Sequence, residues 1–219
     1  MATPIGNLAD ITYRAVHILQ QVDLIAAEDT RKSSILLNHY HINTPLRSYH
    51  SYNLRRETPR LIERLKQQQA VALISDAGTP GISDPGYHLV QACIQEDIRI
   101  IPIPGPSALI TALVASGLPS HRFVFEGFLP QKKGRKTRLE QLAREERTVV
   151  LYESPHRILK TVKELHEYFG NRYCVMAREL TKKFEEFFRG RLAELANYLE
   201  SKPIKGEIVL LIQGFNKRE

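Results

Sequence analysis

Carboxylates and cations that could move a proton or bind an anion stand directly beside apolar stretches of the chain. Glu28 and Asp29 end one such stretch, with Arg31 next to them, and Glu153 ends another. A carboxylate can act as a general base, and a neighbouring cation can stabilise developing negative charge. Simpler interpretations stay open, since Asp29 can cap a helix and Glu153 can pair with Arg157. Glu28, Asp29 and Glu153 are nevertheless the candidate catalytic residues.

The densest run of turn residues reads SDAGTPGISDPG, from Ser75 to Gly86. It starts where an apolar segment ends, and it finishes with Asp84 as a predicted N-cap and Pro85 at the first helical position. Its glycines let a ligand approach the backbone closely. Strand-to-helix connections usually have about two to six residues. The longer connection here favours a ligand-binding loop over a plain turn.

Two further turn-rich segments precede predicted helices: TPIGNL from Thr3 to Leu8, and PIPGPSA from Pro102 to Ala108. None of the three loops carries a dinucleotide G-x-G-x-x-G or a P-loop ending in G-K-[ST], which argues against a nicotinamide or nucleoside triphosphate ligand. The spacing of His39 and His41 suits no metal site, so no metal is expected. No G-x-S-x-G nucleophile elbow is present.

Apolar runs of strand length alternate with segments of helical spacing, which predicts an α/β protein. The runs are continuous rather than alternating, as in parallel or mixed sheets covered by helices. The predicted strands are residues 23–28, 71–76, 99–103, 122–128, 148–153, 173–178 and 207–213. The predicted helices are residues 10–21, 58–69, 86–95, 107–116, 137–143, 157–168 and 192–200.

A boundary between two α/β lobes is predicted near the sequence GLPS at 117–120, which gives lobes of residues 1–118 and 119–219 with a ligand cleft between them. The first lobe has ten basic and ten acidic residues and the second has 21 and 14, so the second lobe contains the whole net charge of +7. Lys132–Arg138 alone holds five positive charges. This asymmetry indicates an anionic partner, with a solvated basic face as the alternative.

Composition narrows the class of protein. The 219 residues are 42% hydrophobic and 25% charged, which excludes disordered and collagen-like chains. No apolar run reaches the roughly 18 residues of a membrane helix, and the N-terminus shows no secretory signal. Cys93 and Cys174 lie in apolar runs, which favours buried free thiols and a reducing cytoplasm.

Seven motifs occur together and in a fixed order along essentially the whole chain: TPIGNLADIT (3–12), AAEDTR (26–31), SDAGTPGISDPG (75–86), PGPSA (104–108), FEGFLP (125–130), YESPHR (152–157) and ARELTK (177–182). Together they resemble the ribosomal RNA small subunit methyltransferase I family, a branch of the tetrapyrrole methylases. Family members usually have an apolar strand before the first motif and a small helical tail after the equivalent of Gly214. Here Met1 and Ala2 alone precede the motif and the chain ends at Glu219, so we expect the first strand to be missing.

The resemblance implies S-adenosylmethionine as the cofactor and, as the acceptor, a cytidine ribose in the decoding region of small-subunit ribosomal RNA, free or in the 30S particle. It also implies a homodimer in the cytoplasm, with no role for DNA or a membrane. The implied fold has two α/β lobes, with a mostly parallel N-terminal sheet, a mixed C-terminal sheet and the cofactor between them. A methylase of a small tetrapyrrole, or a basic RNA-binding module without catalysis, stays open as an alternative.

Motif by motif, the resemblance assigns cofactor binding to both lobes. These residues are Asp76, Gly78, Thr79, Pro80, Gly81, Ile82, Ser107, Ala108, Tyr152, Ala177 and Arg178. Because the resemblance implies an RNA substrate, five basic residues are candidate contacts to RNA phosphates. They are Arg31, Lys132, Lys133, Arg135 and Lys136.

Overall fold

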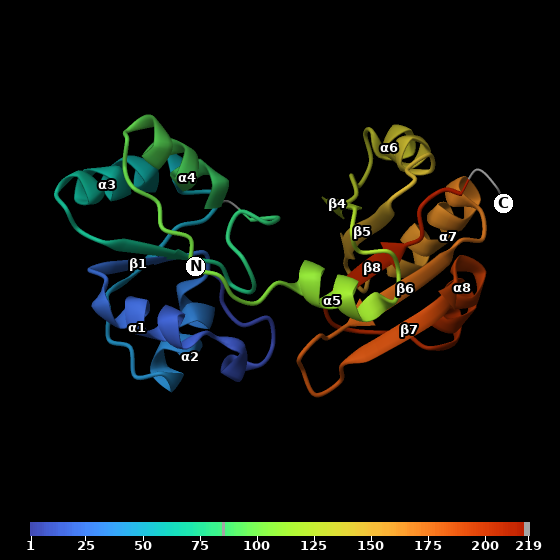
Figure 1. Cartoon of the computed structure of the whole chain (residues 1–219), viewed down its shortest axis with the longest axis horizontal. Coiled ribbons are helices and arrows are strands. Elements are labelled where there is room, and N and C mark those ends of the chain that lie inside the picture. Colours follow the sequence, from blue (N-terminus) through green and yellow to red (C-terminus); the bar gives the residue numbers. More distant parts are fainter. Residues whose placement is uncertain (85, 217–219) are drawn as a thin grey trace. The chain divides into compact units, whose positions relative to one another are not determined.

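The chain folds into two compact units, Met1–Ser107 and Ala108–Glu219 (Figure 1). The structure, a computed structural model, describes residues 1–84 and 86–216. Each unit has its own β-sheet and its own buried core. None of the helices within the described residues is long and apolar enough to cross a membrane.

The first unit is built on a three-stranded parallel sheet with the order β2-β1-β3. Its strands are β1 (Leu24–Ala27), β2 (Leu46–Ser48) and β3 (Val71–Ile74). Its helices are the short 3-10 helix η1 (Leu8–Asp10), α1 (Tyr13–Gln21), α2 (Thr30–His39), α3 (Leu54–Lys66) and α4 (Gly86–Gln95).

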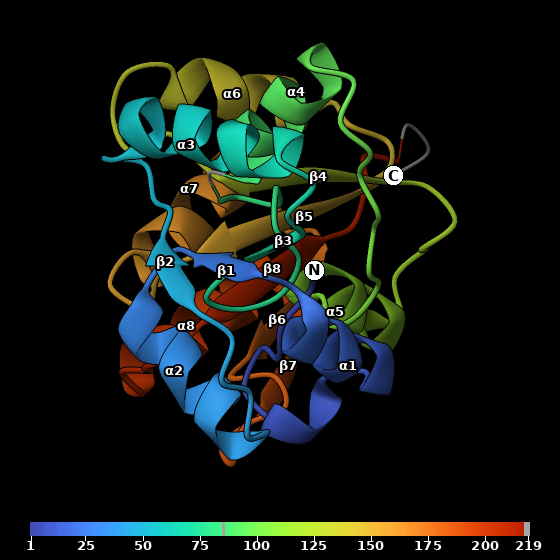
Figure 2. The same ribbon diagram turned by 90° about the vertical axis from the view of Figure 1, so that its left-hand side faces the viewer.

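Helices cover both faces of this sheet (Figures 1 and 2). Successive side chains of a strand point to opposite faces. Accordingly, Ile25 and Ala27 of β1 belong to the core formed with α1 and α2, whereas Leu24 and Ala26 belong to the core formed with α3 and α4. A strand buried on both faces is uniformly apolar, which explains the continuous run in β1.

The second unit has a mixed five-stranded sheet with the order β4-β5-β8-β6-β7. Strand β4 runs parallel to β5, and all other neighbours are antiparallel. The strands are β4 (Phe123–Phe128), β5 (Thr148–Glu153), β6 (Tyr173–Arg178), β7 (Glu186–Arg191) and β8 (Ile208–Ile212). The helices are α5 (Ala108–Ser116), α6 (Arg135–Leu142), α7 (Ile158–Phe169) and α8 (Leu192–Ser201).

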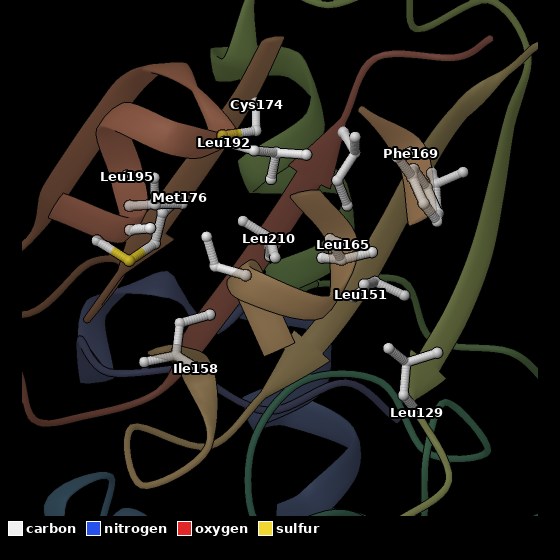
Figure 3. Packing of buried hydrophobic residues seen from close by; sticks show 14 of the residues in the cluster. Leu129, Leu151, Ile158, Leu165, Phe169, Cys174, Met176, Leu192, Leu195 and Leu210 are labelled. Atoms are coloured by element: carbon white, nitrogen blue, oxygen red, sulfur yellow. The ribbon is translucent and has the colours of Figure 1, made fainter. Parts of the chain in front are cut away.

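One face of this sheet packs against α7 and α8, where Met176 of β6 and Leu210 of β8 contact Leu165 and Leu195 in a single core (Figure 3). Helix α5 packs against β6 and β8 on the other face (Figure 1). Because α5 contributes its apolar side chains to this second sheet, the two units divide just before it. The boundary expected at residues 118 and 119 therefore lies one helix earlier in the structure.

The expected fold class, two α/β lobes with a parallel and a mixed sheet, is confirmed. Both cysteines are buried and free, as predicted. The strand predicted over residues 99–103 is wrong, because this segment has no strand pairing. Instead, the Met1 amine donates to the carbonyl oxygen of Leu73, and the Ala2 N–H donates to that of Ile103. Within the described residues, η1 is the first helix or strand of the chain.

Candidate functional site

The three turn-rich loops of the first unit meet in space, although they are far apart in sequence. Thr3 and Gly78 exchange two backbone hydrogen bonds of 2.9 Å. The Thr79 hydroxyl donates to the carbonyl oxygen of Pro106 at 3.1 Å. A Cβ atom added to Gly105 would lie 3.0 Å from the Cβ of Ala2, so these backbones approach closely. The loops thus form one structure beyond the carboxyl end of β3, where α/β sheets bind ligands.

Two glycines of the glycine-rich loop, Gly78 and Gly81, have different structural roles. Gly78 (φ +80°) and Gly81 (φ +86°) adopt a left-handed conformation that glycine tolerates best. The Gly78 N–H and C=O are both bonded to Thr3, so this residue shapes the loop rather than offering free backbone groups. Gly81 is exposed, and a Cβ atom added there would meet nothing within 4 Å. The open side of the loop is therefore at Gly81.

Asp84 closes the loop. Its Oδ1 accepts hydrogen bonds from the N–H groups of Gly81 and Gly86, at 2.6 and 2.7 Å. Its Oδ2 is buried and has no hydrogen-bond partner among the described residues. A buried acceptor left unpaired costs roughly 1–3 kcal/mol, so its place beside an open loop fits a ligand that brings a donor. Pro85, the predicted first helical residue, lies outside the described residues.

Glu28 is half-buried where β1 ends. Burial raises the pKa of its carboxyl group, and the charges of Asp76 and Asp84 raise it further. Asp76 is held in place: its Oδ1 accepts from the Asp29 N–H and its Oδ2 from Lys32 Nζ, both at 2.8 Å. A carboxylate with a raised pKa is a better proton acceptor near neutral pH than an ordinary one.

The pKa of Asp29, unlike that of Glu28, is lowered by its surroundings. It is the N-cap of α2, and its Oδ1 accepts from the Arg31 N–H at 2.9 Å. The Arg31 guanidinium also binds both carboxylate oxygens, at 3.1 and 2.8 Å. These hydrogen bonds lower the pKa of Asp29 to about 2. The capping interpretation, left open by the sequence, therefore describes what the structure shows for Asp29, which is a weak base.

Glu153, in the second unit, is only 2% exposed. It accepts from the Ser154 N–H at 2.8 Å and the Thr161 hydroxyl at 2.7 Å, and it pairs with Arg157 at 2.7 Å. The ion pair with Arg157 is the alternative that the sequence leaves open. A carboxylate so enclosed supports the junction of β5 and α7, and it has little access to a substrate.

Arg135 is bound into the same network and is only 8% exposed. Its guanidinium donates to Thr161 at 2.8 Å, to Glu164 at 2.6 Å and to the Pro130 carbonyl at 3.0 Å. The expectation that Arg135 contacts RNA does not fit this burial. Lys132, Lys133 and Lys136 are exposed, as a phosphate-binding surface requires.

The remaining cofactor candidates of the second unit stand at the ends of β5 and β6. Tyr152 is partly buried with its ring 5.0 Å from that of Phe125, and burial raises the pKa of its hydroxyl. Ala177 is fully buried. Arg178 pairs with Glu186 at 2.7 Å, so its charge is already compensated. Ser107 and Ala108, both partly exposed, stand where one unit ends and the next begins.

Sequence reasoning missed a pocket in the first unit, between α2, the Thr3–Leu8 loop and the end of β3. Lys32 and Ser33 of α2 line it. Ser33 is three and four residues before Leu36 and Leu37, so helical spacing places a polar side chain on the apolar face. That mismatch is the signal that could have drawn attention to it. Across residues 1–84 and 86–216, no three side chains gather as metal ligands.

The chain is similar to known proteins along most of its length. Residues 2–196 match the model of the Tetrapyrrole (Corrin/Porphyrin) Methylases. A ribosomal RNA small subunit methyltransferase I of Pasteurella multocida is 53% identical to the chain over 223 residues, which cover 100% of the chain and 79% of that protein. The protein of the same name from Thermotoga maritima is 47% identical over 98% of the chain and 96% of its own length.

Solved structures show the same fold at low sequence identity. A cobalt precorrin-4 methyltransferase superposes with a TM-score of 0.73 at 17% identity, over 97% of this chain and 92% of that one. A uroporphyrin-III C-methyltransferase from Thermus thermophilus, solved with S-adenyl homocysteine, gives 0.66 at 18% identity, over 97% and 95%. The chain therefore belongs to the tetrapyrrole (corrin/porphyrin) methylases and, within them, to the ribosomal RNA small subunit methyltransferase I family.

Proposed function

We propose that this protein transfers the methyl group of S-adenosylmethionine to the ribose 2′-hydroxyl of a cytidine in the decoding region of small-subunit ribosomal RNA. The observation that carries the proposal is the identity of about half, over 98–100% of this chain, to proteins named ribosomal RNA small subunit methyltransferase I. The three loops that meet beside Glu28 support the same proposal, because they offer a place for a ligand next to a carboxylate that can accept a proton. Assembly as a homodimer, in the cytoplasm, belongs to the same proposal and rests on the resemblance.

The cofactor would be held by the loop from Gly78 to Ile82 together with Asp76 and Ser107 in the first unit. In the second unit the candidates are Ala108, Tyr152, Ala177 and Arg178. The open face at Gly81 and the unpaired Oδ2 of Asp84 fit a ligand that carries hydrogen-bond donors. When bound, S-adenosylmethionine supplies an activated methyl group for in-line displacement.

Glu28 is the proposed proton acceptor. A ribose hydroxyl is a weak nucleophile at neutral pH, and a carboxylate within hydrogen-bond reach can take its proton as the new bond forms. Lys32 supplies a positive charge close to the same carboxylates, since it pairs with Asp76 and lowers the pKa of Glu28. Much of the remaining catalysis comes from holding the hydroxyl in line with the methyl group.

The exposed side chains of Lys132, Lys133 and Lys136 would bind the phosphates of the RNA, with Arg31 as a further phosphate contact. Such contacts give affinity and orientation without reading sequence. Phe128, which is 52% exposed beside these lysines in sequence, offers an aromatic face for a base.

The test uses the full chain and small ribosomal subunits isolated from a strain that lacks the methyltransferase. The subunits are incubated with methyl-labelled S-adenosylmethionine, and ribose methylation is mapped along the RNA. We expect label on one cytidine 2′-oxygen of the decoding region. Label on a base, on another region or on no RNA at all would refute the proposal. Free ribosomal RNA, assayed in parallel, decides which form is the substrate.

A further inference from the structure

The pocket beside α2 is lined by both apolar and polar side chains. Its cavity volume is about 120 Å³. Pro4, Leu8 and Leu36 contribute apolar surface, whereas Ser33 and Asp76 contribute polar atoms. Apolar walls with a few hydrogen-bonding groups suit a small, mostly apolar ligand such as a nucleobase.

Ser33 is the unusual member of this lining. It is 5% exposed, and its Oγ has no hydrogen-bond partner among the described residues. A helical serine can donate to the carbonyl four residues earlier. The neighbouring Ser34 does so, at 2.7 Å from the carbonyl oxygen of Thr30. Ser33 lacks this bond, so its hydroxyl is buried against the pocket without a role in holding the helix.

The pocket is separate from most of the cofactor candidates. Of the residues assigned to the cofactor in the first unit, Asp76 lines it, but Gly78–Ile82 and Ser107 do not. The Oδ1 atom of Asp76 accepts a hydrogen bond of 2.8 Å from the N–H of Asp29, the residue directly after Glu28, so the pocket lies close to the proposed proton acceptor. A molecule in this pocket would thus lie next to Glu28 without occupying the glycine-rich loop.

We propose that this pocket receives the base of the acceptor nucleotide, with the Ser33 hydroxyl as its hydrogen-bond partner. The inference rests on the proposed function, because it gives the RNA substrate a place within the first unit. Enzymes that modify a nucleotide commonly turn it out of its stack into a fitted pocket, where the base meets apolar faces and hydrogen bonds. Ser33 is therefore a positioning residue for the acceptor.

The test compares Ser33→Ala with Ser34→Ala as the matched control on the same helix. Small ribosomal subunits that lack the methyl group serve as substrate, and the affinity for S-adenosylmethionine is measured by calorimetry. For Ser33→Ala we expect kcat/KM for subunits to fall about tenfold, the typical effect of removing one hydrogen bond. Cofactor affinity should stay within twofold, and the thermal midpoint should be equal or higher because an unpaired buried hydroxyl is removed.

Ser33→Leu, which fills the pocket, should reduce kcat/KM further while cofactor affinity is retained. Three results would overturn the inference. Unchanged kcat/KM in Ser33→Ala would show that the hydroxyl does not contact the acceptor. A lower thermal midpoint with a parallel loss in Ser34→Ala would show a structural role. Weaker cofactor binding in Ser33→Ala would assign the pocket to the cofactor. If the proposed function itself is wrong, the unmodified protein will not methylate the subunits.

Discussion

Glu28 and Asp29 are neighbours in the chain but differ in acid–base character, because their surroundings differ. Asp29 caps a helix and is bound by Arg31, which lowers its pKa to about 2. Glu28 is half-buried near two other carboxylates, which raises its pKa. Carboxylates whose surroundings push their pKa values apart have different functions. Glu28 is for this reason the stronger candidate for the base.

We expect Glu28→Gln to lower kcat by a factor of about 10²–10⁴, the usual range for removal of a general base. Affinity for S-adenosylmethionine should not change. In the unmodified protein, activity should fall as the pH falls through the raised pKa of Glu28, which lies above 4.5. A pH–rate profile with labelled small subunits measures both effects.

Asp76→Asn tests whether Glu28 is the group that titrates on the acidic limb of the pH–rate profile. The charge of Asp76 raises the pKa of Glu28, so its removal should shift the acidic limb of the profile to lower pH. The shift should vanish in the double variant with Glu28→Gln. An acidic limb that keeps its position in both variants would show that another group titrates.

At the scale of elements, one buried carboxylate joins β2 to α3. Glu57 of α3 is 2% exposed and binds Arg47 of β2 as well as Arg56 and Arg60 of its own helix. These hydrogen bonds and charges lower its pKa to about 2 from an ordinary value of 4.5. A carboxylate with a lowered pKa stabilises the folded state above its ordinary value, and this stability is lost as the pH falls through the lowered one.

We expect Glu57→Gln to reduce the free energy of unfolding at pH 7 by roughly 2 kcal/mol, since it leaves three guanidinium groups without their shared carboxylate. The difference from the unmodified protein should shrink between pH 4.5 and about 2. Urea unfolding at several pH values measures it. Glu63→Gln, an exposed change on the same helix, should stay within about 0.5 kcal/mol. Equal effects of the two substitutions would contradict the role of Glu57.

The sequence predicts the central strands and two edge strands, β3 and β4, but it misses the edge strands β2 and β7. Strands such as β1 and β8 are buried on both faces, so an unbroken apolar run marks them. The edge strands β2 (LRS) and β7 (EFFRGR) are partly exposed and polar, and no run marks them. Residues 99–103 are apolar but include Pro102, which has no N–H to donate to a neighbouring strand. Helix α2 is absent from the predicted helices, although the sequence offers Asp29 as a helix cap.

The sequence likewise predicts some features of the candidate site and not others. The motifs locate the loops, but the pairing of Thr3 with Gly78 depends on strand order, which a single sequence does not reveal. Whether a charged side chain is exposed or buried also depends on packing. Within one basic run, Lys132 is exposed and Arg135 is buried, and the local sequence holds no signal that separates them.

At the scale of the whole molecule, the excess positive charge belongs to the second unit, and the exposed lysines of residues 132–136 are its candidate contact with RNA. We expect the double variant Lys132→Ala/Lys133→Ala to weaken binding to ribosomal RNA. The slope of log affinity against log salt should flatten by roughly 0.7–0.9 for each phosphate that is no longer neutralised. Affinity for S-adenosylmethionine should be unchanged. Binding titrations at several salt concentrations measure the slope.

The control removes two lysines of α7, Lys160 and Lys163, and so changes the net charge equally. If both double variants flatten the slope to the same extent, the effect comes from overall charge and the assigned loop is wrong. Arg135→Ala is unsuitable for this purpose. Its guanidinium is bound to Glu164 and Thr161, so its removal would also disturb folding.

The loop that carries Lys132 and Lys133 is held in place at both ends, and this affects how it binds RNA. Leu129 before it is buried in the core of the second unit, and Arg135 after it is bound into the hydrogen-bonding network. Only a handful of residues between these fixed points can move, so little backbone freedom is lost when phosphates bind. A glycine-serine insertion after Lys133 would leave every charge in place and enlarge that freedom. Affinity for RNA should then decline through entropy alone, with an unaltered salt slope.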